Sequence, residues 1–140
     1  MTIDPMNAPI LGDSVPADPP RPIRVASALL LGNVVIAAAY RIYTAFDASF
    51  SIFVIPLALG IWFAFAVRAG RGWARTAATV LGLLSIGMTI WVVGYAVVNV
   101  RTGWGLETTV DLAALVASVT LLLTAMRLMW RADVNDYFSP

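Results

Sequence analysis

The sequence predicts an all-α fold, a four-helix transmembrane bundle, and three observations support that prediction. Apolar residues make up 60% of the 140-residue chain and charged residues 12%, about half of the usual charged share. Four apolar runs each approach the ~20 residues that an α-helix needs to cross a bilayer. The runs lack the period-2 alternation of β-barrel strands. Because a small domain cannot bury so much apolar surface, lipid is the expected solvent of most of the chain.

The expected spans follow one another with short connections. They run over about 25–46, 50–67, 76–98 and 110–130. Together they define a transmembrane domain over residues 23–131, followed by a cytoplasmic tail over 132–140. In that tail, Tyr137 and Phe138 lie either on the membrane interface or in a small contact patch, and the sequence leaves both readings open.

The first 22 residues have a different composition. Residues 1–22 hold six prolines and three aspartates, which predicts a disordered, partly polyproline arm on the cytoplasmic side. The Pro-Pro-Arg-Pro stretch at 19–22 is most simply a stiff spacer. The alternative is a docking peptide for a proline-reading domain.

The arginines predict an orientation. All nine basic residues are arginine, and with a cytoplasmic N-terminus seven lie on the cytoplasmic side. The other two, Arg41 and Arg101, lie on the opposite side. The positive-inside rule then predicts a multi-pass protein of the bacterial plasma (inner) membrane, with both termini cytoplasmic. In this topology Asp47, Glu107 and Asp111 are expected in the two external loops.

The stretch VRAGRGWART, residues 67–76, joins the second and third expected spans. Its glycines let the chain reverse. Arg68, Arg71 and Arg75 are expected to bind the anionic inner leaflet, each contributing on the order of 1 kcal/mol. Trp73 is expected at the interface, where amphipathic rings accumulate. The alternative is a dedicated site for a lipid headgroup or for the acidic tail of a partner.

Arg41 is the charged residue nearest to membrane depth. It lies 17 residues past Arg24, or about 26 Å along a helix, so we expect it to snorkel to the outer interface. The simplest role is a structural pair with Glu107 or Asp111. The alternative is a small external anion site built with Arg101.

Two further residues interrupt the apolar spans. Asn33 lies about 13 Å past Arg24 at the same rise, near the middle of the bilayer. An amide at that depth most often bonds to a neighbouring helix, and the alternative is that it lines a pathway. Pro56 removes one backbone hydrogen bond from the second span and predicts a kink.

Small residues recur at intervals of four along the third span. Ala74, Ala78 and Gly82 form the longest such ridge. Small residues let helices approach closely in lipid, where packing drives association. The ridge therefore predicts that this face packs against another helix.

Several chemical classes are excluded by residue content. The chain has no cysteine and no histidine, which removes disulfides, thiolate chemistry and the usual zinc or haem ligation. No carboxylate is expected within a span, which argues against a proton-coupled exporter, and no phosphate-binding loop is present. We therefore expect no enzymatic activity, no cofactor, no metal site and no nucleic-acid partner.

Two motifs carry a resemblance. The stretch RPIRVASALLL opens the first span, and RAGRGWAR leads into the third. With the proline-rich arm and the aromatic tail, they resemble small uncharacterised four-helix integral membrane proteins of actinobacteria. The resemblance covers residues 21–140 loosely, and the absence of lysine agrees with a high-GC bacterial genome. It implies location and topology, and no active site.

Two functions fit these observations. The first is an accessory or scaffolding subunit of a membrane assembly, with the bilayer and other membrane proteins or a second copy as partners. The second is a small transporter or channel for an apolar or lipid-like substrate, with a path past Asn33 and Pro56. An open cavity that reaches Asn33 would favour the second function, whereas a solid core would favour the first.

Overall fold

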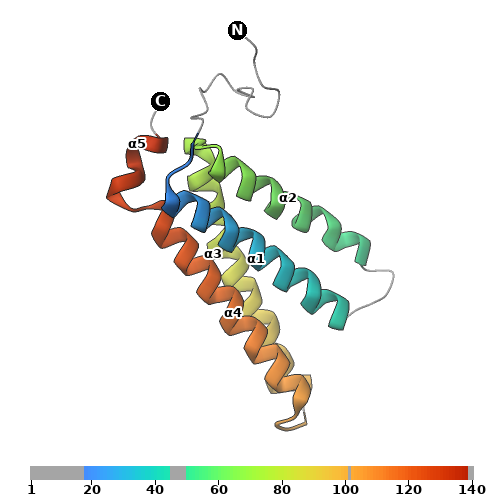
Figure 1. Cartoon of the computed structure of the whole chain (residues 1–140). Coiled ribbons are helices and arrows are strands. Elements are labelled where there is room, and N and C mark those ends of the chain that lie inside the picture. The colour runs from blue at the N-terminus through green and yellow to red at the C-terminus, as the bar shows by residue number, and fades with distance from the viewer. Residues whose placement is uncertain (1–17, 45–49, 101, 139–140) are drawn as a thin grey trace.

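The computed structural model describes residues 18–44, 50–100 and 102–138, which form helices and turns without any strand. The elements in chain order are α1 (Arg21–Thr44), α2 (Phe50–Arg68), α3 (Gly72–Tyr95), the π-helical turn η1 (Ala96–Val100), α4 (Leu106–Met129), the 3-10 turn η2 (Ala132–Val134) and α5 (Asn135–Phe138). The predicted all-α class is confirmed for this part of the chain (Figure 1).

Within the described part of the chain, three helices are long and apolar enough to cross a membrane. They cover Arg21–Tyr43, Gly72–Asn99 and Leu106–Met129, and a shorter apolar helix covers Val54–Arg68. A helix satisfies its own backbone polar groups, which is what a lipid solvent requires. The protein therefore has the helices of a multi-pass membrane protein.

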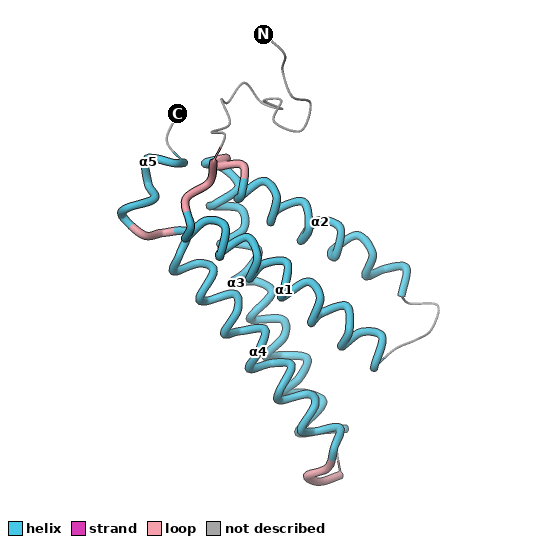
Figure 2. The backbone as a smooth tube through the Cα atoms, viewed as in Figure 1, coloured by secondary structure: helices cyan, strands magenta, loops and turns pink. Residues whose placement is uncertain are grey.

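The four long helices form a bundle in which α1 packs most closely on α4 and on α2, while α3 contacts α4 and α2 more lightly. The start of α1, the α2–α3 turn and the C-terminal segment share one end, which we call the tail end (Figure 2). The end of α1 and the start of α4 lie toward the opposite end, the far end, where α3 and α4 extend beyond the other two helices (Figure 1).

The buried core gathers toward the tail end. Its members come from every long helix and from the C-terminal segment: Ile23, Ala26, Leu30, Ala64, Ala66, Val67, Ala74, Ala78, Leu122, Ala125, Met126, Met129, Val134 and Phe138. Many large apolar side chains elsewhere are exposed, including Trp91 and Val98 of α3 and η1. In lipid such exposure has no hydrophobic cost, because the acyl chains are as apolar as the side chains.

The first helix begins earlier than the apolar run that predicts it. The amides of Ile23 and Arg24 donate to the carbonyl of Pro20 at 3.0 and 3.1 Å. Pro22 fits this first turn because its missing N–H has no partner there in any helix. Arg21 and Pro22 therefore belong to α1 and not to the arm. Residues 1–17, Asp47 and Arg101 lie outside the described residues.

The turn between α2 and α3 is a Schellman motif. The Gly70 amide donates to Val67 O at 3.0 Å, and the Arg71 amide donates to Ala66 O at 3.2 Å. Gly70 has a φ of 73°, a left-handed conformation that glycine adopts without a Cβ penalty. The glycine predicted to reverse the chain therefore does so by closing the C-terminus of α2.

The C-terminal segment folds back over that turn. Val134 and Phe138 are buried in the core, and the Tyr137 hydroxyl donates to Arg68 O at 2.6 Å. This bond satisfies one of the carbonyls that the end of α2 leaves without a helical partner. Of the two readings left open for the tail, the structure shows the contact patch, and the patch is internal to the chain.

Candidate functional site

A cavity lies between the four long helices. It consists of two adjoining pockets of about 410 and 360 Å³ that share lining residues on three helices: Ala37, Pro56, Leu57, Ser85 and Met88. We call these two adjoining pockets together the bundle cavity. Its pockets fall within the range of about 300–1,000 Å³ that is usual for ligand sites.

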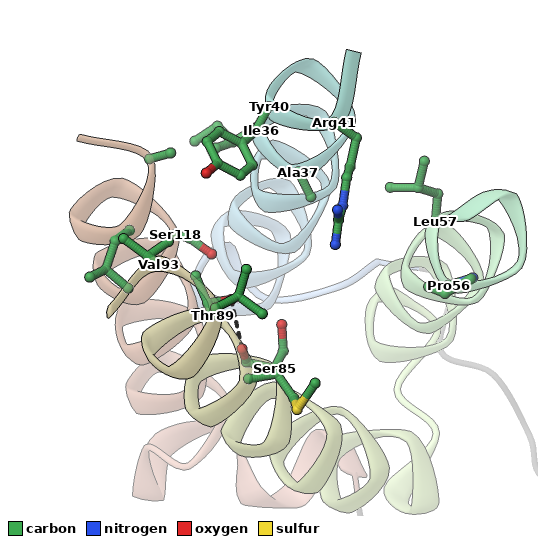
Figure 3. Close-up of a pocket in the computed structure, with 14 residues that line it drawn as sticks. Ile36, Ala37, Tyr40, Arg41, Pro56, Leu57, Ser85, Thr89, Val93 and Ser118 are labelled. Atoms are coloured by element: carbon green, nitrogen blue, oxygen red, sulfur yellow. Dashed lines mark hydrogen bonds between the residues drawn. The ribbon is translucent and has the colours of Figure 1, made fainter. Parts of the chain in front are cut away.

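The far part of the cavity carries most of its polar side chains. Tyr40 and Arg41 line it from α1, and Thr89 lines it from α3. Figure 3 shows Arg41 extending from α1 into the space bounded by α2 and α3, whereas Tyr40 turns toward α4. Among the lining residues that the structure describes, Arg41 is the one charged side chain. The cavity thus has a single cationic group, at its far part.

The inner part, nearer the tail end, is mostly apolar. Its walls are Leu30, Val34, Leu59, Phe63, Leu81, Leu84 and Leu122, together with small residues of α2 and α3. Asn33 is a polar exception, and its Oδ1 accepts a hydrogen bond from Ser118 at 2.6 Å. Asn33 therefore joins α1 to α4, the first of the two roles that the sequence offers for this amide, and it also lines the cavity.

A carboxyl group lies inside the bundle where the sequence predicts none. Asp111 is fully buried in α4 and accepts a hydrogen bond from the Tyr40 hydroxyl at 2.7 Å. The expectation that Glu107 and Asp111 lie in an external loop is wrong, because α4 begins at Leu106. Asp111 then falls in the second turn, on the side facing α1. The argument against proton coupling, which assumed spans without carboxylates, no longer holds at this end.

Pro56 lies within α2, which continues through it. The proline ring lines both pockets of the cavity, opposite Ser85 and Met88 of α3. Since proline frees one backbone carbonyl of the preceding turn, it weakens α2 beside the cavity.

The small-residue ridge of α3 is used inside the chain. Ala74, Ala78 and Gly82 are all buried. A Cβ added at Gly82 would meet the Cε atom of Met126 and lie 3.8 Å from Leu122 Cδ2. The ridge therefore faces α4 of the same chain, and the missing side chain at Gly82 admits Met126.

The three arginines of the α2–α3 stretch have different surroundings. Arg71 is buried, with 7% of its surface exposed, whereas Arg68 is exposed. The Arg75 guanidinium lies 4.2 Å from the centre of the Trp130 ring and 4.9 Å from that of Phe138. The C-terminal segment thus packs against this stretch. Of its three arginines, Arg68 is the most exposed.

Hydrogen bonds join this stretch to the C-terminal segment and the end of α4 to α3. Arg75 Nη1 donates to Asn135 Oδ1 at 2.7 Å, and Trp130 Nε1 donates to Thr79 Oγ1 at 2.9 Å. Trp73 packs on Trp62, with ring centres 5.4 Å apart. Its Nε1 is buried and has no hydrogen-bond partner within the described part of the chain. Trp73 therefore joins an aromatic cluster between α2 and α3.

Sequence reasoning missed the pairing of Tyr40 with Asp111. The two residues lie 71 positions apart, and no local pattern connects them. The available signal was helical spacing: Asp111 is four residues past Glu107 and lies one turn deeper than the polar start of α4. Only the packing of α1 on α4 shows which residue it meets.

The chain matches no family model, no curated protein and no solved structure. The resemblance to four-helix membrane proteins of actinobacteria therefore stays a prediction. What the site shows by itself is a cavity between apolar helices, with mostly apolar walls and one arginine among the described lining residues.

Proposed function

We propose that this protein is a non-enzymatic, multi-pass protein of the bacterial plasma membrane that binds an apolar or lipid-like molecule in the bundle cavity. A small transporter or channel for such a substrate would need this site. The observation that carries the proposal is that the cavity reaches Asn33, in the middle of α1. In the proposed topology the tail end, where α1 begins and the C-terminal segment folds back, faces the cytoplasm.

We place the entrance of the cavity between α2 and α3, which contact each other more lightly than α1 contacts its neighbours. Figure 3 shows Leu57 of α2 and Ser85 of α3 on opposite sides of the open space. A ligand dissolved in the bilayer could therefore enter sideways between these two helices, without crossing the loops.

An accessory or scaffolding subunit is the second candidate. Faces of small residues would support this role, but two such residues already lie against side chains of the same chain: Gly82 against Met126, and Gly60 of α2 against Val34. What favours it is the face of α3 at Gly87 and Gly94, where nothing lies within 4 Å. A stoichiometric partner recovered from native membranes by crosslinking would support this role.

A matched pair of substitutions on α1 tests the cavity. Ala37 lines both pockets, while Ala39, two residues along the same helix, is exposed and lines neither. Each alanine is replaced by leucine in a separate variant. Each variant and the wild type are reconstituted in phosphatidylcholine vesicles with photoactivatable alkyl probes, one ending in an alcohol and one in a phosphate. Crosslinked peptides are then identified by mass spectrometry.

The proposal expects saturable labelling of lining peptides in the wild type. Ala37→Leu should abolish that labelling because its side chain fills the space shared by the two pockets. Ala39→Leu should leave it unchanged. Labelling that never saturates with either probe, or that responds equally to both substitutions, would show only annular lipid and would overturn the proposal.

A further inference from the structure

Resting on the proposed function, we infer that the bundle cavity binds an uncharged, lipid-like molecule that carries a carbonyl group. Asn33 and Ser85 would donate hydrogen bonds to the carbonyl oxygen, and apolar side chains would enclose the rest of the molecule. Two features carry this inference. The fold leaves two hydrogen-bonding groups open in one pocket, and the walls of that pocket are otherwise apolar and uncharged.

The amide of Asn33 is only half used by the bundle. Its Oδ1 accepts the hydrogen bond from Ser118 at 2.6 Å, whereas its Nδ2 has no hydrogen-bond partner in the described part of the chain. The buried side-chain polar atoms that lack a partner in that part are Trp73 Nε1 and Arg75 Nε, so Asn33 Nδ2 is not enclosed by the protein. Because an amide nitrogen offers two donors and the bilayer core has no water to accept them, this group is open to a ligand.

The hydroxyl of Ser85 is open in the same way. Hydroxyls in helices can donate to the carbonyl one turn back, and those of Thr79, Thr89 and Thr120 do so at 2.8, 2.7 and 2.7 Å. The Ser85 hydroxyl forms no hydrogen bond with the residues that the structure describes. Ser85 is exposed and lines both pockets, and Figure 3 shows it beside the open space.

Asn33 and Ser85 line the same pocket, the inner one of about 360 Å³, from α1 and α3 respectively. A carbonyl oxygen has two lone pairs and can accept a hydrogen bond from each residue. Since Ser118 occupies Oδ1 of Asn33, the amide meets a ligand as a donor. An oxygen that only accepts, as in a ketone or an ester, therefore matches the pair. An N–H group of a ligand would face the amide donor against donor.

The walls of that pocket favour an uncharged ligand. Its described lining includes no charged side chain, and apart from Asn33 and Ser85 it is apolar. Arg41 lines the other pocket and already has an interaction within the chain, so no ligand charge is needed to balance it. A charged group would lie unpaired in the inner pocket, which costs far more free energy than an unpaired carbonyl.

The depth of the pocket favours a free molecule over the ester groups of the bilayer lipids. Asn33 lies 12 residues past Arg21 and 11 before Thr44 within α1, or about 16–18 Å from either end of the helix. Lipid esters belong to the interfacial layer outside the hydrocarbon core. An apolar molecule with a carbonyl can reach the middle of the bundle, because it has no headgroup that must stay in water.

The test compares two photoactivatable probes that differ in one group. Both are unbranched alkyl chains with a diazirine near one end, and one has a ketone at mid-chain where the other has a methylene. The full-length protein is reconstituted in vesicles of ether-linked phosphatidylcholine, which contains no carbonyl. Half-saturating amounts, expressed per lipid, are measured for labelling of the peptides around Leu57 and Leu84. We expect the ketone to label at about tenfold lower amounts, as two hydrogen bonds in lipid would provide.

Four variants assign this preference to its cause. Ser85→Ala and Asn33→Leu should each reduce it to about threefold, and the double variant should abolish it. Thr120→Val is the control, because Thr120 lines neither pocket and bonds only to its own helix. It should keep the full preference. Labelling by the methylene probe should persist in all four, which shows that the cavity still forms.

Asn33→Leu also removes the bond to Ser118. Ser85→Ala removes no hydrogen bond of the described chain, so it still tests the inference if the Asn33 variant fails to accumulate. The preference should also persist when ester-linked phosphatidylcholine replaces the ether-linked lipid.

The outcomes separate the two proposals. Equal labelling by the two probes in the wild type would overturn the carbonyl ligand and leave the cavity-binding function standing. A preference for the ketone that survives in the double variant would do the same. Loss of the preference in ester-linked vesicles would assign the site to bilayer lipids and overturn the free ligand. Absence of saturable labelling by either probe would overturn the proposed function, and the carbonyl ligand with it.

Discussion

The hydroxyl of Tyr40 donates a 2.7 Å hydrogen bond to the carboxyl group of Asp111 and so joins α1 to α4 beside the cavity. Asp111 is fully buried. A polar group in such a place is costly unless it is hydrogen-bonded, so this contact stabilises the far end of the bundle, where few apolar side chains are buried.

Tyr40→Phe should lower the free energy of unfolding by about 1–3 kcal/mol, because it removes a bond to a buried acceptor. The matched control is Tyr43→Phe, since Tyr43 is exposed on the same helix. Circular dichroism during titration of dodecylmaltoside micelles with sodium dodecyl sulfate measures both. Equal stability of the two variants would contradict the structural role of the pair.

Gly82→Leu should destabilise the bundle by about 1–3 kcal/mol, as overpacking does at a close contact between helices. The added side chain would have to displace Met126 and then pass Leu122. Gly87→Leu is the control on the same helix, because nothing lies within 4 Å of Gly87. The amount of each variant in the membrane and its free energy of unfolding in mixed micelles measure the effect. A Gly82→Leu protein that accumulates as well as wild type would refute this packing.

Phe138→Ala should release the C-terminal segment. The ring is buried, and loss of a buried phenylalanine costs about 3 kcal/mol. Trypsin should then cleave after Arg131 faster than in the wild type. Asp136→Ala, an exposed change in the same short helix, should leave the rate unaltered. Unchanged cleavage of the Phe138 variant would mean that polar contacts alone hold the segment.

Docking of this segment should also depend on pH. Burial raises the pKa of the Tyr137 hydroxyl above its ordinary value, and the nearby Arg68 offsets part of that effect. The stabilisation by the neutral phenol is therefore complete below about pH 10, the value for a free tyrosine. It is lost as the pH rises through the higher folded value, because the phenolate is favoured in the undocked tail.

A single fluorophore can follow that transition. The chain has no cysteine, so Asp136→Cys provides one labelling site on the segment. Fluorescence anisotropy should fall above about pH 10 as the segment undocks. With Tyr137→Phe added, the anisotropy should start lower, because the bond to Arg68 is gone, and should stay level with pH. A parallel fall in both proteins would exclude Tyr137 as the titrating group.

The helices themselves could be predicted from the sequence. In lipid the backbone must satisfy its own polar groups, so an apolar run of membrane length becomes a helix whatever its neighbours are. The beginning of α2 at Phe50 agrees with the expected span. The reversal at Gly70 was also predictable, because a left-handed turn residue at a helix end is usually glycine.

The helix ends were less predictable. Hydropathy places the fourth span from about residue 110, whereas α4 begins at Leu106 and takes in Glu107 and Asp111. At the tail end, η2 and α5 form in a segment too short and polar to be predicted as helical. These turns form because Val134 and Phe138 become buried against other helices. That burial depends on tertiary packing, which the local sequence does not show.

The sequence by itself determined the membrane setting, the all-helical class and the inventory of polar side chains. Only the tertiary structure decided that Asn33 meets Ser118, that Tyr40 meets Asp111, and that Arg41 turns into a cavity. The physical reason lies in the solvent. A soluble helix shows its inner face by its apolar stripe. A helix in lipid is apolar on every side, so its sequence does not show which face points inward. That face is decided only when the helix packs against its neighbours.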